Sequence, residues 1–203
     1  MAYHGYIPFM KHFLSHFKEP KVLEIGVDKG QTTIPILHHL LMTRKTFMFR
    51  AIDIVAFKEV NDIIKNFDKL STQTFVFNVM NSLDYFETSS SDEKYDLVLV
   101  DGDHNYYTVS RELDAIKRRI NESSIIILDD YSGRYAEKDF FYGEEDSARD
   151  VMAATKFVKT EKHGVKIAID EFVINNPEWK AAILYKGEPI VLYRATSLGM
   201  KFL

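Results

Sequence analysis

The stretch Val22-Leu23-Glu24-Ile25-Gly26-Val27-Asp28-Lys29-Gly30 decides the fold. It begins as a short, mostly apolar run that is typical of a buried strand, and two glycines close it. Glycine permits a tight turn and lets the backbone approach a ligand closely. Thr32–Leu41 follows with a helical pattern, and Pro35 falls in its first turn, where proline is tolerated. We therefore predict a strand, a ligand-binding turn and a helix.

Short apolar runs alternate with amphipathic stretches along the chain. The predicted strands are Val22–Ile25, Phe47–Ile54, Thr74–Val79, Asp96–Val100 and Ser124–Leu128. The predicted helices are Thr32–Leu41, Val60–Leu70, Val109–Ile120, Ala148–Val158 and Val165–Ile174. A terminal hairpin is predicted from Lys180–Tyr185 and Ile190–Arg194. The alternation predicts an α/β fold of the Rossmann-like type, with a doubly wound, mostly parallel seven-stranded sheet that ends in an antiparallel hairpin.

Length and composition narrow the class of protein. The 203 residues fit a single domain, 1–203, with an N-terminal helix expected over 1–20. The formal net charge of −4 argues against non-specific nucleic-acid binding, which requires Lys and Arg to neutralise phosphates. The chain has no cysteine, which excludes disulfides, thiolate metal ligands and cysteine nucleophiles. No apolar run approaches the ~20 residues that span a bilayer, so we expect no membrane association and a cytoplasmic location.

The glycine turn and the end of the second strand together predict a nucleoside-binding site. Gly26 and Gly30 do not have the G-x-G-x-x-G spacing of dinucleotide-binding proteins, which argues against a dinucleotide oxidoreductase. Asp53 ends the second strand, where a carboxylate can accept hydrogen bonds from both ribose hydroxyls. Ligands of doubly wound sheets collect at the carboxyl ends of the strands, so these residues should meet at one edge.

Two further apolar strands end in acidic side chains. The first delivers Asp101-Gly102-Asp103-His104 to its carboxyl end, and the second delivers Asp129-Asp130. Like charges held close together raise one another's pKa unless a cation lies between them. Mg²⁺ prefers oxygen ligands and keeps waters or substrate oxygens, so it suits such a group of carboxylates. The sequence therefore predicts a magnesium site at these strand ends.

The run Leu23-Glu24-Ile25-Gly26-x-x-x-Gly30 resembles the first motif of class I S-adenosylmethionine-dependent methyltransferases. The resemblance implies that the loop binds the methionine part of S-adenosylmethionine, and that Thr32 or Thr33 adds a hydroxyl near its carboxylate. Asn81-Ser82 follows the third strand and is expected near the adenine. The expected cofactor-binding residues are Glu24, Gly26, Val27, Gly30, Thr32, Thr33, Asp53, Ser82, Asp101 and His104.

The acidic segments Asp101-Gly102-Asp103-His104-x-Tyr106 and Leu128-Asp129-Asp130-Tyr131 are similar to those of the metal-dependent, macrocin-type O-methyltransferases, which act on sugar hydroxyls. The resemblance implies Mg²⁺ bound by Asp101, Asp129 and Asp130. It also implies that Asp103 is the general base. His104 remains an alternative base, because an unperturbed histidine titrates near neutral pH.

The segment 131–146 is aromatic and acidic, and we expect it to form a lid over the acceptor. The function expected from the resemblance is Mg²⁺-dependent O-methylation of a small molecule, most simply a sugar or glycoside, without nucleic-acid or membrane partners. Homo-oligomerisation is left open. The alternatives are a cofactor-binding module without catalysis and a metal-independent methyltransferase with a macromolecular acceptor.

Overall fold

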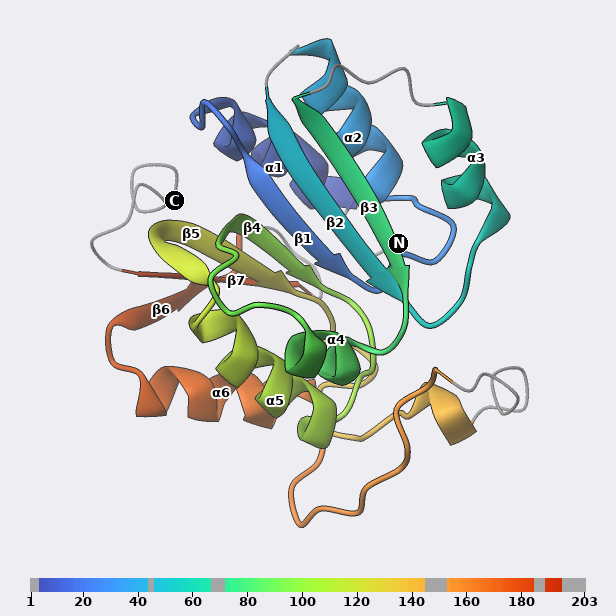
Figure 1. The fold of residues 1–203 in the computed structure, drawn as a ribbon. Helices are drawn as coiled ribbons and strands as arrows, with labels where there is room; N and C mark the ends of the chain where they lie inside the picture. Colours follow the sequence, from blue (N-terminus) through green and yellow to red (C-terminus); the bar gives the residue numbers. More distant parts are fainter. Residues whose placement is uncertain (1–3, 44–45, 67–71, 145–152, 185–188, 195–203) are drawn as a thin grey trace.

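The computed structural model describes residues 4–43, 46–66, 72–144, 153–184 and 189–194. Within them lies a seven-stranded sheet with the order β3-β2-β1-β4-β5-β7-β6 (Figure 1). The strands are β1 Lys21–Ile25, β2 Phe47–Asp53, β3 Gln73–Val79, β4 Tyr95–Val100, β5 Ile120–Leu128, β6 Trp179–Ala182 and β7 Ile190–Arg194. β1 to β5 pair in parallel, and β7 runs antiparallel to both β5 and β6. This arrangement confirms the predicted fold class.

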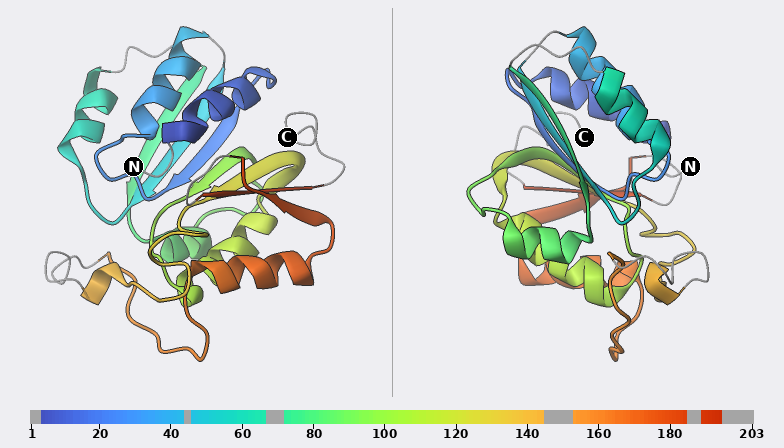
Figure 2. Two further views of the ribbon diagram at one scale, coloured as in Figure 1. Left: turned by 180° about the vertical axis from the view of Figure 1, so that it is seen from behind. Right: turned by 45° about the vertical axis from the view of Figure 1, so that its right-hand side comes forward.

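Helices cover both faces of the sheet (Figure 2). One face packs against α1 Ile7–Ser15, α2 Thr33–Met42 and α3 Lys58–Asn66. The other packs against α4 Ser82–Thr88, α5 Tyr106–Lys117 and α6 Val165–Asn175. Two short 3-10 helices, η1 His4–Tyr6 and η2 Tyr142–Glu144, complete the described helices. The molecule is therefore a three-layer sandwich with an apolar core on each side of the sheet.

The central strand β4 shows why both layers are needed. All six of its residues are buried, and successive side chains point to opposite faces. Leu97 and Leu99 belong to the core beneath α1 and α2, whereas Val98 and Val100 belong to the core beneath α5 and α6. Its apolar character on both faces is typical of a parallel sheet covered by helices on each side. Asp101 follows directly, so the buried strand fixes where the acidic segment begins.

Several predicted helix bounds were wrong. The N-terminal helix does not extend over 1–20: α1 ends at Ser15, and residues 16–20 are not helical. The helix predicted over Ala148–Val158 is also wrong, because residues 153–158 form turn and coil, while 148–152 lie outside the described residues. The helix α3 starts two residues early, at Lys58, and the predicted residues 67–70 are not described.

Side-chain caps explain two further differences between the predicted and the observed helices. The helix α5 begins at Tyr106 and not at Val109, because the Asn105 side chain accepts the Thr108 N–H at 2.7 Å. The helix α4 was not predicted, and Asn81 caps it by accepting the Asp84 N–H at 2.9 Å. A helix of seven residues is too short for apolar periodicity to identify.

The strands also differ at their ends. β5 begins at Ile120, where the helix α5 was expected to end, and not at Ser124. β6 covers Trp179–Ala182, so the strand predicted over Lys180–Tyr185 stops early, and residue 185 is not described. Within the described residues, no helix is long and apolar enough to cross a membrane.

Leu113 on α5 has no exposed surface, whereas Ile174 on α6 is 75% exposed. We expect Leu113→Ala to lower the free energy of unfolding by about 2–5 kcal/mol, because it leaves a cavity in the core. Ile174→Ala is the control and should change that free energy by less than about 0.5 kcal/mol. Urea unfolding followed by circular dichroism measures both, and equal effects would contradict the described packing.

Candidate functional site

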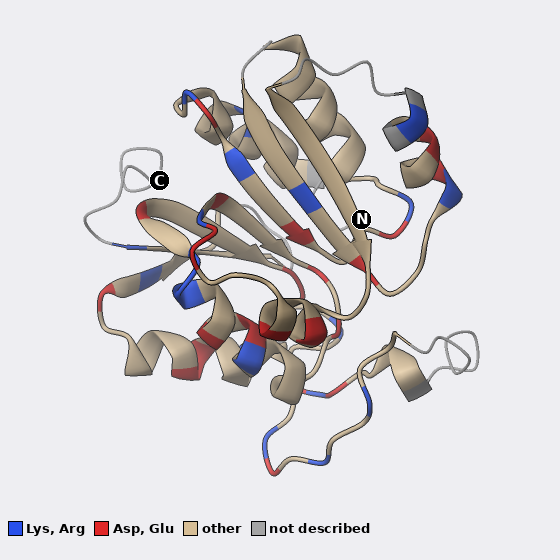
Figure 3. Ribbon diagram, viewed as in Figure 1, with Lys and Arg blue, Asp and Glu red and all other residues tan. Residues whose placement is uncertain are grey.

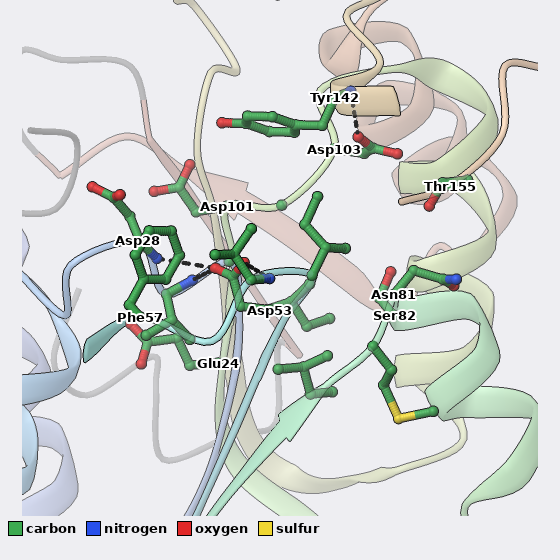
Figure 4. Close-up of a pocket in the computed structure, with 18 of the residues that line it drawn as sticks. Glu24, Asp28, Asp53, Phe57, Asn81, Ser82, Asp101, Asp103, Tyr142 and Thr155 are labelled. Atoms are coloured by element: carbon green, nitrogen blue, oxygen red, sulfur yellow. Dashed lines mark hydrogen bonds between the residues drawn. The ribbon is translucent and has the colours of Figure 1, made fainter. Parts of the chain in front are cut away.

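A cavity of about 620 Å³ lies at the carboxyl ends of β1, β2 and β4, where the glycine turn, the acidic strand ends and the turn between β3 and α4 meet (Figure 4). Its lining comprises Glu24, Ile25, Gly26, Val27, Asp28, Gln31, Thr32, Ile52, Asp53, Ile54, Val55, Phe57, Met80, Asn81, Ser82, Asp101, Gly102, Asp103, Asp129, Tyr142 and Thr155. The position matches the expectation that ligands of such sheets bind beyond the strand ends.

The glycine turn approaches β4 so closely that a side chain cannot fit. Gly26 has a φ of +82°, and a Cβ atom at this position would lie 1.8 Å from the Asp101 carbonyl oxygen. The Gly26 N–H donates to the Ile52 carbonyl at 2.9 Å, and the Asp101 N–H donates to the Ile25 carbonyl at 2.8 Å. The turn is thereby held between β2 and β4, and the acidic segment is placed beside it.

Asp53, at the end of β2, ties the glycine turn to the next loop. Its Oδ2 accepts the N–H groups of Val27 and Asp28 at 2.7 and 3.0 Å, and its Oδ1 accepts the Val55 N–H at 3.0 Å. Burial raises the pKa of Asp53, and the backbone donors oppose that shift. Each carboxylate oxygen has a second lone pair, so Asp53 retains acceptor capacity toward the cavity.

Glu24 is a buried carboxyl at the floor of the cavity. It accepts the Thr33 hydroxyl at 2.6 Å, and Thr33 has no exposed surface. Desolvation raises the pKa of Glu24 to about 8, so the group is mostly protonated at neutral pH. Thr33 thus makes a hydrogen bond inside the protein, whereas its neighbour Thr32 lines the cavity.

Asp101 and Asp129 form a carboxyl pair at the ends of β4 and β5. Burial raises the pKa of Asp101 well above its usual range, and the nearby Asp129 raises it further. Two carboxylates this close repel each other when both are ionised, which favours a proton on one of them. Both line the cavity, and acidic residues gather at these strand ends (Figure 3). A cation bound between these two carboxyl groups can take the place of that proton.

Asp130 points elsewhere. It adopts a left-handed φ of 56°, and its Oδ2 lies 3.1 Å from His104 Nδ1. The left-handed backbone thus directs the Asp130 carboxylate to His104, although Asp130 also lies near enough to Asp101 to raise the pKa of that carboxyl. In the described part of the chain, no group of three or more His, Asp or Glu side chains is arranged to hold a metal ion. Among the described residues, the predicted ligands Asp101, Asp129 and Asp130 do not form such a group.

The two candidate bases have different environments. Asp103 lines the cavity, and it accepts hydrogen bonds from the Tyr142 N–H at 3.1 Å and the Thr108 hydroxyl at 3.3 Å. Burial raises its pKa. His104 lies beside the cavity and not in its lining, and burial lowers its pKa to about 4. The Asp103 carboxylate is therefore more basic than usual and lies in the cavity, whereas the His104 imidazole is less basic than usual and is enclosed.

The described part of the predicted lid packs over His104. The Tyr135 ring stacks on the imidazole at 5.2 Å between centroids, and the Phe140 N–H donates to the His104 carbonyl at 2.9 Å. Asp139 Oδ1 accepts the N–H groups of Tyr106 and Gly164, both at 2.8 Å, which fixes the segment to the starts of α5 and α6. Tyr142 extends from this segment over the cavity (Figure 4).

Most of the predicted cofactor-binding residues meet in the cavity. Those in its lining are Glu24, Gly26, Val27, Thr32, Asp53, Ser82 and Asp101. Those outside the lining are Gly30, Thr33 and His104. The apolar lining residues Ile54, Phe57 and Met80 were missed, because no motif distinguishes them from core residues. Thr155 was missed because its segment was expected to be helical.

The comparisons with known proteins agree with this geometry. Residues 23–131 match the family model described as a methyltransferase domain. The fold is similar to an S-adenosylhomocysteine-bound methyltransferase of Podospora anserina (13% identity, TM-score 0.56), over 96% of this chain and 80% of that one. It is also similar to the O-methyltransferase of Bacillus cereus in complex with S-adenosylhomocysteine (15% identity, TM-score 0.53), over 93% and 80%. A search of curated protein sequences found no match.

The family match covers more than half of the chain, so the chain belongs to this methyltransferase family. With its seven-stranded sheet and strand-end cavity, it is a class I S-adenosylmethionine-dependent methyltransferase. The structural similarities, at identities this low, establish the shared fold.

Gly26→Ala tests the close approach of the glycine turn to β4. The added Cβ would collide with the Asp101 carbonyl, so we expect the variant to bind S-adenosylhomocysteine at least about tenfold more weakly or to lose several kcal/mol of stability. Gly102→Ala is the matched comparison, since its Cβ would meet two side chains, Ile25 at 3.1 Å and Glu112 Oε1 at 3.9 Å, and no backbone atom of another segment. Calorimetric titration and thermal unfolding measure both variants, and a Gly26→Ala protein like wild type would contradict the geometry.

Glu24→Gln tests the raised pKa of the buried carboxyl. The folded pKa is about 8 and the unfolded one about 4.5, so the unfolded chain ionises first as pH rises, and stability falls between these values. Glutamine cannot ionise and still accepts the Thr33 hydroxyl. We expect the variant to gain about 1 kcal/mol relative to wild type for each pH unit between pH 5 and 8. Urea unfolding across this range, with the exposed Glu19→Gln as control, checks the slope.

Proposed function

We propose that this methyltransferase transfers the methyl group of S-adenosylmethionine to a hydroxyl oxygen of a small molecule, with a sugar or other polyol as the acceptor. The observation that supports the proposal is the single cavity in which the glycine turn, Asp53 and the acidic ends of β4 and β5 meet. Gly26 and Val27 would contact the methionine part of the cofactor, and Asp53 would accept the ribose hydroxyls. The apolar Ile54 and Met80 suit the faces of a purine.

The charge of the cavity supports a small acceptor that is not a polyanion. Six carboxylate residues line it: Glu24, Asp28, Asp53, Asp101, Asp103 and Asp129. Among the described lining residues there is no Lys, Arg or His. Nucleic-acid binding depends on cationic side chains that neutralise phosphates, so an acceptor of that kind is disfavoured. Carboxylates accept hydrogen bonds from hydroxyl groups, and the Tyr142 ring offers an apolar wall.

Mg²⁺ dependence is part of the proposal, in a form with fewer protein ligands than the sequence suggested. Asp101 and Asp129 supply two neighbouring carboxyl groups, and their interaction raises the pKa of Asp101. Mg²⁺ is often held by one or two carboxylates plus oxygens from substrate or water. The donor set therefore fits Mg²⁺ held by these two residues. When bound, the ion would lower the pKa of a coordinated acceptor hydroxyl.

Asp103 is the proposed general base. It faces the cavity with a raised pKa, and the Tyr142 N–H and Thr108 hydroxyl hold its carboxylate in place. Asp103 takes the proton of the acceptor hydroxyl, and the oxygen attacks the methyl carbon. The bond between that carbon and sulfur breaks, and its electron pair stays on sulfur to give S-adenosylhomocysteine. Asp130 would orient the buried His104, which supports the loop that presents Asp103.

Methyl transfer from labelled S-adenosylmethionine to a panel of sugars, glycosides and catechols tests the reaction. We expect Asp103→Asn to lower kcat by about 10²–10⁴-fold while S-adenosylhomocysteine affinity changes little, because the residue acts on the acceptor proton. His104→Gln should lower kcat less. Cofactor binding without turnover on any hydroxyl compound would support a module without catalysis, and turnover only on RNA or protein would support a macromolecular acceptor.

Removal of divalent metal by EDTA tests the magnesium proposal. We expect activity to fall at least about tenfold and to return when Mg²⁺ is added. Asp129→Asn should raise the Mg²⁺ concentration needed for half-maximal activity. Asp130→Asn is the matched control and should leave that concentration within about twofold, because Asp130 faces His104. Full activity after chelation would reject the metal, and equal effects of both variants would reject the assignment of ligands.

A further inference from the structure

A second buried carboxyl lies under the cavity and takes no part in the proposed chemistry. Glu112 projects from α5 with no exposed surface, and its Oε1 accepts the Ser82 hydroxyl at 2.5 Å. Its Oε2 is buried and has no hydrogen-bond partner among the described residues. Ser82, at the start of α4, lines the cavity. The pair therefore connects a buried acid on α5 to a hydroxyl at the cavity wall.

In the turn between β3 and α4, Ser82 supplies the polar side chain that is available to a ligand in the cavity. Three successive residues of the turn between β3 and α4 line the cavity: Met80, Asn81 and Ser82. The Met80 side chain is apolar. The Asn81 side chain is used by the helix cap, since its Oδ1 accepts the Asp84 N–H at 2.9 Å and its Nδ2 donates to Asp84 Oδ2 at 2.7 Å. A base that rests on Met80 and Ile54 would therefore meet the Ser82 hydroxyl at its edge.

We propose that Glu112 is a positioning residue that fixes the Ser82 hydroxyl as a hydrogen-bond acceptor toward the nucleoside base, and that this pair selects the 6-amino group of adenine. The inference rests on the proposed cofactor site and adds the means by which the base is recognised. A serine hydroxyl has one hydrogen to donate and two lone pairs. Because Glu112 accepts that hydrogen, only the lone pairs remain for a ligand.

The acceptor character of Ser82 holds for the ionised carboxylate of Glu112 and for the acid whose proton lies on Oε2. Desolvation raises the pKa of Glu112 to about 8, and Asp103 adds to this shift, so the carboxyl is mostly protonated at neutral pH. The proposal places that proton on Oε2, so that Oε1 accepts from Ser82. A proton on Oε1 would instead donate to Ser82 and free its hydroxyl hydrogen for the ligand, and wild type would then show no preference. An adenine amino group donates to Ser82. A hypoxanthine carbonyl at the same position places two acceptors against each other and leaves both unsatisfied, which is costly in a buried site.

Calorimetric titration of the full chain with S-adenosylhomocysteine and with S-inosylhomocysteine tests the proposal. The two ligands differ in the base, where a carbonyl oxygen replaces the amino group at position 6 and N1 gains a hydrogen. We expect wild type to bind S-adenosylhomocysteine at least about tenfold more tightly. In Glu112→Leu the freed Ser82 hydroxyl can donate to the carbonyl, so the preference should fall below about threefold. Glu112→Gln keeps an acceptor for Ser82 and should retain the wild-type preference.

Ser82→Ala removes the recognising hydroxyl itself and should also reduce the preference, so it provides the test if Glu112→Leu does not fold. A role for Glu112 in helix packing alone would lower stability and leave the ratio of the two affinities unchanged. An unchanged ratio in Glu112→Leu and Ser82→Ala, or no preference in wild type, would overturn the inference. Failure of wild type to bind S-adenosylhomocysteine at all would instead overturn the proposed cofactor site, and this inference with it.

Discussion

The packing of Gly26 against the Asp101 carbonyl is the constraint on which the site depends. Only a residue without a side chain, held at a positive φ, lets the end of β1 lie against the end of β4 at this distance. The glycine turn and the acidic segment therefore open into one cavity. Asp53 reinforces the arrangement from β2, because its carboxylate binds two N–H groups of the turn. The proposed cofactor contacts and the acidic residues thus share one backbone junction.

Burial of acids distinguishes the floor of this cavity. Glu24 and Glu112 each have a pKa of about 8, and each accepts a hydroxyl from a neighbouring helix start, Thr33 and Ser82 respectively. Protonated carboxyls of this kind add polar partners without adding charge at neutral pH. At the ends of β4 and β5, burial and the neighbouring Asp129 also raise the pKa of Asp101. The arrangement leaves the cavity acidic and suited to a cationic cofactor, since the sulfonium and ammonium groups of S-adenosylmethionine outnumber its carboxylate.

The sequence predicted the sheet well because its strands are buried on both faces. Runs such as Leu97–Val100 have no other stable place in a soluble domain, and the glycine turn marks where the first strand ends. The ends of helices were less predictable. The start of α5 depends on the cap by the Asn105 side chain, and the start of α4 depends on the cap by the Asn81 side chain. Each of these starts is therefore decided by a single side chain. The segment 153–158 is held by its neighbours and not by its own periodicity.

The positions of site residues were predictable where a motif or a strand end specified them, and were not predictable where they depend on the direction of a side chain. The positions of Gly26, Asp53 and Asp101 follow from strand ends, so sequence placed them correctly in the cavity. The paired letters Asp129-Asp130 suggested two ligands, but the left-handed backbone at Asp130 directs its carboxylate to His104. Glu112 had no sequence signal, because an acid on the buried face of a helix looks like a surface residue until packing is known.

The central claim is that the cofactor occupies the cavity between the glycine turn and the acidic strand ends. A crystal structure of the complex with S-adenosylhomocysteine tests it most directly. The account predicts the ribose hydroxyls within hydrogen-bond distance of the Asp53 carboxylate, the thioether sulfur facing Asp101, and the adenine beside Met80 and Ser82. A nucleoside bound away from Asp53, or a cavity that stays empty at saturating ligand, would contradict it.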